Sequence, residues 1–361
     1  MKILYAIQGT GNGHISRARD IIPILQKKAQ LDILISGTQC DLHLPYPIKY
    51  QLKGLSFVFG KKGGVDLVKT YSKSRLRNLL DEICNLPVEN YDLIINDFEP
   101  VSAWACKLKN KSCYSLSHQS AVLNIHSPQP KHIDVVGKSI LRRYAPTTAE
   151  YGFHFSDFSK NIYTPVIRKQ VRDIIPVDGN HYTVYLPAYS DKRIIKMLTR
   201  FDQVQWEVFS KHTLKGYSYH NVSVSPVDND RFLSSMASAT GILCGAGFET
   251  PAEALFLKKK MLVIPMKGQY EQHCNAAALR QMGVPVIKNL KHKRIEDISD
   301  WLSSSTRINV DYPDITEEII DRLLHDHTRT QIIPEETFDT PLVLPLSRMY
   351  TLKKILSQLA G

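Results

Sequence analysis

The sequence predicts an α/β protein of two Rossmann-like domains, each a doubly wound parallel sheet, facing one another across a central cleft. Residues 2–7 form an apolar run that a glycine-rich loop and an amphipathic helical pattern follow, and strand, loop and helix in this order open a Rossmann-like half. Residues 240–255 repeat the order with an apolar strand, a glycine turn and a helix. A chain of 361 residues is long for one core and sufficient for two.

The first predicted strand runs into the loop Gln-Gly-Thr-Gly-Asn-Gly-His at residues 8–14, and a helix is expected over residues 15–29. A dinucleotide fingerprint counted from Gly9 would require glycine at the position of His14. The next predicted strand, 31–35, also lacks an acidic residue at its end for a ribose hydroxyl. We therefore reject NAD binding at this loop.

Two further strands of the first domain place polar residues at their carboxyl ends. Residues 91–95 lead to Asp97, and residues 112–116 lead to His118. Because the carboxyl ends of parallel strands share one edge of a sheet, both side chains are expected on the same edge as His14. Asp97 has an alternative role, since it could cap a helix predicted at residues 99–107.

The rest of this half is less regular. Helical spacing covers residues 67–86 and 124–151, with short strands expected at 55–59 and 153–155. The proline-containing stretch 158–179 has little apolar periodicity and is interpreted as the domain boundary. The predicted units are 1–160, 161–340 and a terminal helical unit, 341–361.

The net charge is +11, and residues 49–77 carry eight basic residues against Asp66 alone. Such a cluster can attract acceptor phosphates or anionic lipid head groups, whereas nucleic acid is disfavoured because no nucleic-acid-binding motif accompanies the charge. The six cysteines include no Cys-x-x-Cys pair, which favours a reducing cytoplasm and no structural zinc. No apolar run is long enough to span a membrane.

The second domain continues the αβ alternation, with strands predicted at 181–186, 205–210 and 222–224 and helices at 191–200, 230–239, 295–303 and 315–326. Gly245 and Gly247 leave backbone N–H groups uncovered where the helix opening at Glu249 or Thr250 directs its positive end, an arrangement that suits a diphosphate. Glu253, one helical turn further, can accept hydrogen bonds from a ribose diol. Ser190 is a weaker candidate for a phosphate contact.

A second polar block, Glu271-Gln272-His273-Cys274-Asn275-Ala276, follows one more strand. The two blocks, Gly-x-Gly-x-x-Thr-x-x-Glu-Ala and then Glu-Gln-x-x-Asn-Ala, resemble the nucleotide-sugar site of GT-B glycosyltransferases of the group around MurG and the UDP-glycosyltransferases. The loop before His14 resembles the N-terminal Gly-x-Gly-x-Gly-His segment of the same group.

The resemblance implies a role for each matching residue. Catalysis falls on His14 as the base, with Asp97 orienting it. Donor binding falls on Gly245, Gly247, Glu249, Thr250, Glu253, Glu271 and Gln272, with Asn275 supporting the loop. The acceptor side of the cleft falls on Gly11, Asn12, Gly13 and His118. A terminal helix over residues 347–359 is expected to cross back to the first domain.

The predicted activity is inverting, metal-independent transfer of a hexose from a nucleotide diphosphate sugar, UDP by resemblance, to an acceptor hydroxyl. No metal and no cofactor are expected. The acceptor is unidentified, with anionic or lipid-linked molecules as candidates, and the basic region 49–77 could contact the inner face of a membrane. Two alternatives are a nucleotide-sugar epimerase of the same fold and a non-catalytic protein that binds nucleotide sugars.

Overall fold

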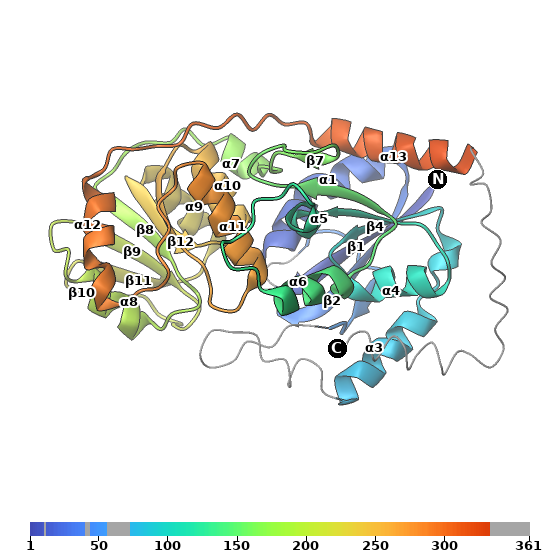
Figure 1. Ribbon diagram of the computed structural model, residues 1–361, viewed down its shortest axis with the longest axis horizontal. Coiled ribbons are helices and arrows are strands. Elements are labelled where there is room, and N and C mark those ends of the chain that lie inside the picture. The colour runs from blue at the N-terminus through green and yellow to red at the C-terminus, as the bar shows by residue number, and fades with distance from the viewer. Residues whose placement is uncertain (11, 40–43, 56–72, 333–361) are drawn as a thin grey trace.

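A computed structural model describes residues 1–10, 12–39, 44–55 and 73–332. These residues form two α/β domains that lie side by side, each with helices on both faces of a central sheet (Figure 1). The predicted fold class of two Rossmann-like domains is therefore confirmed. The predicted strand at residues 55–59, most of the basic region 49–77, Gly11 and the terminal unit 341–361 lie wholly or partly outside the described residues.

The sheet of the first domain has seven parallel strands in the order β3-β2-β1-β4-β5-β6-β7. Its strands are β1 (Lys2–Thr10), β2 (Gln30–Gln39), β3 (Tyr50–Leu52), β4 (Leu93–Asp97), β5 (Cys113–Ser117), β6 (Ala149–Phe153) and β7 (Ile162–Tyr163). The helices of this part of the chain are α1 (Asn12–Lys28), α3 (Lys73–Asn85), α4 (Pro100–Leu108), α5 (His118–Leu123), α6 (Val135–Tyr144) and the 3₁₀ turn η1 (Val88–Asn90). The strand order reverses between β1 and β4, where open α/β sheets place their ligands.

The sheet of the second domain has six strands in the order β10-β11-β9-β8-β12-β13, all parallel except the β10–β11 pair. Its strands are β8 (His181–Tyr185), β9 (Gln205–Ser210), β10 (Tyr217–Tyr219), β11 (Val222–Pro226), β12 (Gly241–Gly245) and β13 (Lys260–Ile264). Its helices are α8 (Asp191–Leu198), α9 (Asn229–Ser238), α10 (Glu249–Phe256), α11 (Tyr270–Gln281), the 3₁₀ turn η2 (His292–Arg294) and α12 (Ile295–Ser303). The switch in strand order lies between β8 and β12, next to the predicted diphosphate turn.

The sequence patterns explain the central strands well. Every residue of β4 and β5 is buried, as expected for strands of a parallel sheet covered by helices on both faces. Two residues after β4, Glu99 caps α4 by accepting hydrogen bonds from the backbone N–H groups of Val101 and Ser102. The alternative role of Asp97 as the cap of this helix is therefore wrong, and its carboxylate is available for other partners.

Two predictions between residues 124 and 155 are corrected. The helix over 124–151 is limited to α6, because Pro128 and Pro130 interrupt the pattern and the chain turns into β6 instead. The strand expected at 153–155 is β6, which ends at Phe153. The sequence of Ala149–Phe153 shows little alternation of apolar and polar residues. This segment is a strand because it pairs with β5 and β7.

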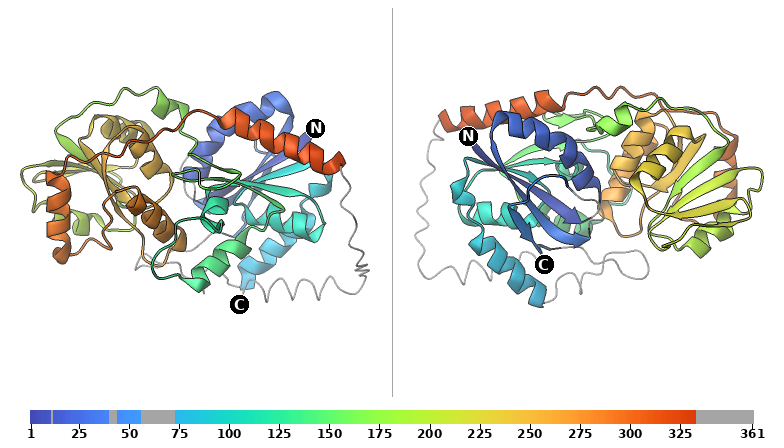
Figure 2. Two further views of the ribbon diagram at one scale, coloured as in Figure 1. Left: turned by 45° about the horizontal axis from the view of Figure 1, so that its top comes forward. Right: turned by 180° about the vertical axis from the view of Figure 1, so that it is seen from behind.

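Helix α13 (Thr316–Ile332) crosses back to the first domain. The prediction that residues 315–326 form a helix of the second domain is therefore wrong. The helix lies along α1 in all views (Figures 1 and 2). Lys28 of α1 forms ion pairs with Glu317 and Asp321, and the Tyr151 hydroxyl donates to Asp326 at 2.6 Å. In the described part of the chain, no helix is long and apolar enough to cross a bilayer.

Candidate active site

A cavity of about 570 Å³, the large cavity, lies between the two sheet edges. From the first domain it is lined by the start of α1, and from the second by the turn after β12 and the starts of α10 and α11. The sequence-predicted residues on its wall are Asn12, Gly13, His14, His118, Gly247, Glu249, Thr250, Glu253, Glu271 and Gln272. Residues more than 200 positions apart in the sequence thus meet around one space.

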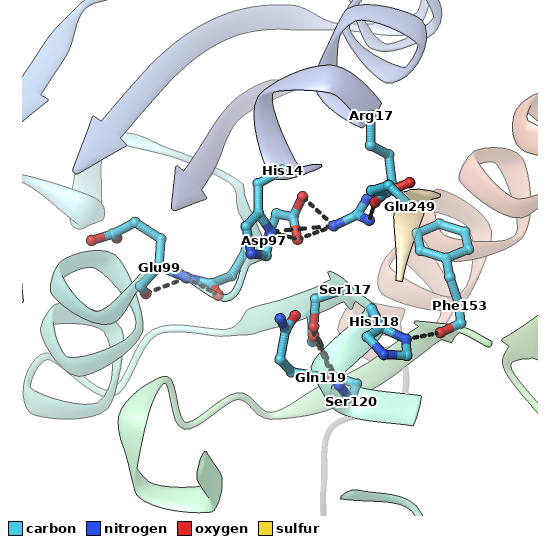
Figure 3. Close-up of polar contacts among 12 residues, drawn as sticks. His14, Arg17, Asp97, Glu99, Ser117, His118, Gln119, Ser120, Phe153 and Glu249 are labelled. Atoms are coloured by element: carbon cyan, nitrogen blue, oxygen red, sulfur yellow. Dashed lines mark hydrogen bonds and ion pairs between the residues drawn. The ribbon is translucent and has the colours of Figure 1, made fainter. Parts of the chain in front are cut away.

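His14 reaches this space from the first turn of α1, and its Nδ1 lies 2.8 Å from Oδ1 of Asp97 (Figure 3). Asp97, at the end of β4, is fully buried. Because Nδ1 is engaged by a carboxylate, Nε2 is the nitrogen that can exchange a proton with a substrate. Phe98 stacks against the imidazole with ring centroids 6.4 Å apart, and its φ of 57° is a left-handed conformation of the kind that concentrates at functional sites.

Arg17, one turn after His14, connects this pair to the other domain. Its Nη2 donates to both oxygens of Asp97, at 2.7 and 2.8 Å, and its Nη1 donates to Oε1 of Glu249 at the start of α10 (Figure 3). Burial alone would raise the pKa of Asp97, but the charges of Arg17 and His14 and their hydrogen bonds hold it below its usual value. Burial raises the pKa of Glu249 to about 7, although Arg17 opposes the shift.

The turn before α10 is open at Gly247. A Cβ placed on Gly247 would meet no atom within 4 Å, so neither packing nor a positive φ accounts for glycine there. The space is part of the large cavity. The N-terminal end of α10 has no side-chain cap from Phe248, which leaves its backbone N–H groups directed at this space.

Glu253, the predicted ribose ligand, lines the large cavity but is also paired. Arg168 donates from Nε to Oε1 at 2.5 Å and from Nη2 to Oε2 at 2.9 Å. Arg168 is held in turn by Oδ1 of Asn229 at 2.9 Å. The bidentate pair fixes the carboxylate at the cavity wall, where its remaining lone pairs can accept from hydroxyl groups.

The second polar block closes the cavity from α11. Gln272 accepts a hydrogen bond from the Met266 N–H at 2.8 Å, and Glu271 accepts from Nε2 of Gln119, on the first domain, at 3.1 Å. Asn275 lies behind the wall and donates to the Ala246 carbonyl at 3.1 Å. This bond ties α11 to the glycine turn.

His118 lies at the contact between the domains. Its Nδ1 lies 2.8 Å from the Phe153 carbonyl oxygen and its Nε2 lies 2.8 Å from Oδ1 of Asn275, while its ring stacks on Phe248 with centroids 3.8 Å apart. Burial lowers the pKa of His118 to about 4, so the ring is neutral at pH 7. His118, like Asn12 and Gly13, lines the large cavity rather than a separate acceptor pocket.

His14 also lines a second cavity of about 220 Å³, the small cavity. It shares five lining residues with the large cavity: Thr10, His14, Gln119, Gln269 and Glu271. Its remaining wall includes Ile140 and Leu141 of α6, Phe98 directly after β4, and Tyr270 at the start of α11. The imidazole of His14 thus borders both cavities.

Of the predicted site residues that the structure describes, Asp97, Asn275, Ser190 and Gly245 line neither cavity. Ser190 precedes α8, is exposed and lines neither cavity. Gly245 ends β12, where an added Cβ would come no closer than 3.9 Å to Gln272 or Ile264, and it lines neither cavity. Gly11 lies outside the described residues.

Sequence reasoning missed Arg17, Arg168 and an aromatic end of the large cavity. Tyr185 and Phe232, with ring centroids 5.6 Å apart, line the end of the cavity next to β8 and α9. Arg17 had a local signal, since it follows His14 by three residues and therefore shares its helix face. Arg168 and the aromatic pair had none, because tertiary packing alone brings them to the cavity.

A family model, glycosyl transferase family 1, matches residues 1–305, most of the chain and both cavity walls. The chain belongs to glycosyl transferase family 1. Membership makes this protein a glycosyltransferase, and it supports glycosyl transfer from a nucleotide sugar in general terms. Among curated proteins, no sequence match was found.

Solved structures support the GT-B fold of this glycosyltransferase. MurG of Acinetobacter baumannii is 15% identical, with a TM-score of 0.54, covering 90% of this chain and 99% of that one. Arabidopsis thaliana UGT89C1 complexed with UDP is 11% identical (TM-score 0.53), covering 100% and 99%. A UDP-N-acetylglucosamine 2-epimerase is 12% identical (TM-score 0.54), covering 94% and 99%.

Proposed function

We propose that this glycosyltransferase moves a hexose from a UDP-sugar to an acceptor hydroxyl with inversion and without a metal ion. The observation that carries the proposal is that two features line one cavity from opposite domains: the uncapped start of α10, with the open position at Gly247, and His14, which is paired with Asp97. Glu253, Glu271 and Gln272 on the same wall are suited to ribose and sugar hydroxyls.

In this mechanism Nε2 of His14 removes the acceptor proton as the hydroxyl oxygen forms a bond to the anomeric carbon. The bond from that carbon to the diphosphate breaks on the opposite face, and its electron pair leaves with UDP. Asp97 stabilises the imidazolium that forms. The positive end of α10 stabilises the departing diphosphate. NMR of the product glycoside tests the inversion, and retained activity in EDTA tests the metal independence.

Substituting Gly247 with alanine tests the donor site. The fold should tolerate the change, since the added methyl meets no protein atom, but the methyl would occupy space assigned to the diphosphate. We expect calorimetry to show UDP binding weakened by about tenfold or more, or about 1.4 kcal/mol. Gly216→Ala is the matched control, since its Cβ makes only ordinary contacts far from the cavity. Unchanged UDP affinity in Gly247→Ala would remove the donor site from this turn.

Epimerisation is the second candidate because one similar structure is an epimerase. An epimerase needs no acceptor, whereas here the small cavity adjoins His14 and is lined by no residue of the α10 turn. This separate space favours transfer. Incubating the enzyme with the UDP-sugar alone separates the two activities, since an epimerase would give the isomeric sugar nucleotide without any acceptor. Binding without any turnover would indicate the non-catalytic alternative.

We further propose that the protein is cytoplasmic and contacts the inner face of a membrane to reach a lipid-linked acceptor. The five cysteines in the described part of the chain are free thiols, which fits a reducing compartment. Next to the small cavity, α6 and the residues before it expose Ile133, Val135 and Val136. Basic residues of the same segment are Lys131, Lys138, Arg142 and Arg143. Exposed apolar side chains among cations are typical of peripheral membrane contacts.

Vesicle sedimentation tests this contact. The protein should pellet with vesicles containing phosphatidylglycerol and much less with phosphatidylcholine vesicles. The double substitution Val135→Asp with Val136→Asp should lower the bound fraction several-fold, because it removes apolar insertion and adds negative charge. Leu214→Asp, at an even more exposed apolar residue of the second domain, should have no effect. Equal losses in both variants would contradict a contact through α6.

A further inference from the structure

Three glutamines line the small cavity, and the side-chain carbonyl oxygen of each is buried without a hydrogen-bond partner among the described residues. They are Gln8 at the end of β1, Gln119 in α5 and Gln269 before α11. Gln8 and Gln119 are only 3% and 5% exposed. Such orphaned acceptors are uncommon in folded proteins and call for a reason.

The partners of the amide nitrogens fix which end of two of these side chains is orphaned. Nε2 of Gln8 donates to the hydroxyl oxygens of Thr10 and Tyr144, both at 2.9 Å. The Tyr144 hydroxyl gives its own proton to the Leu55 carbonyl, so it must accept from Gln8. Nε2 of Gln119 donates to the Glu271 carboxylate at 3.1 Å. In both side chains the nitrogen is occupied, and the oxygen remains for a ligand.

The remaining wall defines what such a ligand can be. Asp134 and Glu271 add carboxylates, and the lining residues include no lysine or arginine. An anionic group would therefore face two carboxylates with no lysine or arginine to balance its charge, whereas a hydroxyl-bearing group could donate to the three orphaned oxygens. Phe98, Ile140 and Leu141 supply apolar surface against which the carbon face of a ring can pack. The volume of about 220 Å³ is below that of sites for drug-sized molecules and suits a single ring.

We propose that the small cavity is the acceptor subsite and takes a neutral, polyhydroxylated ring, such as a hexopyranoside, held by Gln8 and Gln119 with one hydroxyl at His14. The assignment rests on the proposed function in that His14 is taken as the base. A buried carbonyl oxygen without a hydrogen-bond partner destabilises the unliganded protein, and the ring hydroxyls relieve this cost for each oxygen they reach. An anionic portion of the acceptor, which the composition suggested, would lie outside this cavity.

The proposal can be tested in the absence of the sugar donor by measuring the binding of small glycosides to the full-length chain. Saturation-transfer NMR would compare methyl glycosides of glucose, galactose, mannose and N-acetylglucosamine with methyl glucuronide. At least one neutral glycoside should bind, and methyl glucuronide should bind at least tenfold more weakly than the best of them. Gln8→Leu should weaken that binding by about tenfold or more, since it removes one amide recognised by hydroxyls. Gln281→Leu, at an exposed residue that lines neither cavity, is the control.

A transfer assay with the best neutral glycoside then separates this inference from the proposed function. Gln8 lines the small cavity but not the large one, so Gln8→Leu should raise the acceptor KM and leave UDP affinity unchanged. Binding of none of the neutral glycosides, stronger binding of the glucuronide, or an unchanged acceptor affinity in folded Gln8→Leu would overturn the subsite while leaving the donor site intact. If neutral glycosides bind as expected but no UDP-sugar does, the proposed function fails and the subsite stands.

Discussion

His14→Ala should lower kcat for transfer by about 10²- to 10⁴-fold, the range expected for removal of a general base. The substitution removes the group that faces both cavities and leaves Asp97 paired with Arg17. Donor affinity should therefore stay nearly unchanged, because the proposed diphosphate and ribose positions lie on the other domain. Steady-state transfer rates together with calorimetric UDP binding measure the two effects separately.

A histidine remote from the cleft provides the control for this experiment. His292, exposed in η2, should tolerate alanine with full activity. The opposite pattern in His14→Ala, with donor binding lost and transfer still measurable, would contradict the role of the imidazole as base. Comparable kcat in both variants would contradict it as well.

Arg17→Met should destabilise the protein by about 3–5 kcal/mol, the cost expected when one partner of a buried ion pair is removed. Arg17 is 1% exposed, and its loss leaves the buried Asp97 and the partly buried Glu249 without their cation. For a domain of this size, such a change lowers Tm by roughly 10 °C, which differential scanning calorimetry measures. The effect should shrink from pH 8 toward pH 4, because unpaired buried carboxylates have raised pKa values and become neutral as the pH falls.

Two variants show whether the loss comes from the buried charges. Lys28→Met, on the same helix, removes a cation whose partners Glu317 and Asp321 are exposed, and Tm should be nearly unchanged. Arg17→Met combined with Glu249→Gln should recover part of the lost stability by removing one uncompensated carboxylate. A pH-independent loss in Arg17→Met, with no recovery in the double variant, would assign the effect to packing instead.

Much of the fold and site could be predicted because their signals are local. Parallel strands buried on both faces are continuous apolar runs, as in β1 and β12, and the glycine-rich turns lie at the carboxyl ends of these two strands. The rule that ligands gather at the carboxyl ends of such strands then places His14 and Gly247 on facing edges. The cavity that both line agrees with that reasoning.

The features that could not be predicted depend on contacts distant in the sequence. The Arg168–Glu253 pair joins residues 85 positions apart, and no pattern around either indicates the other. Gln8 lies in a strand and looks like an ordinary polar residue until Tyr144, 136 positions away, occupies its nitrogen. Residues 315–326 have the same amphipathic pattern whichever sheet they cover, so their packing on α1 required the tertiary structure.

The position of α13 makes the chain pass between the domains twice, once at residues 164–180 and again at 304–315. The two passages lie next to each other along one side of the molecule (Figures 1 and 2), where Arg172 donates to the Tyr312 carbonyl at 2.9 Å. Two connecting segments on the same side of the molecule oppose twisting and sliding of one domain against the other. The least restricted movement is a hinge rotation of the domains about that side. Such a rotation separates α6 from α11 at the far margin, so exchange of substrates and products is directed to the margin where the small cavity lies.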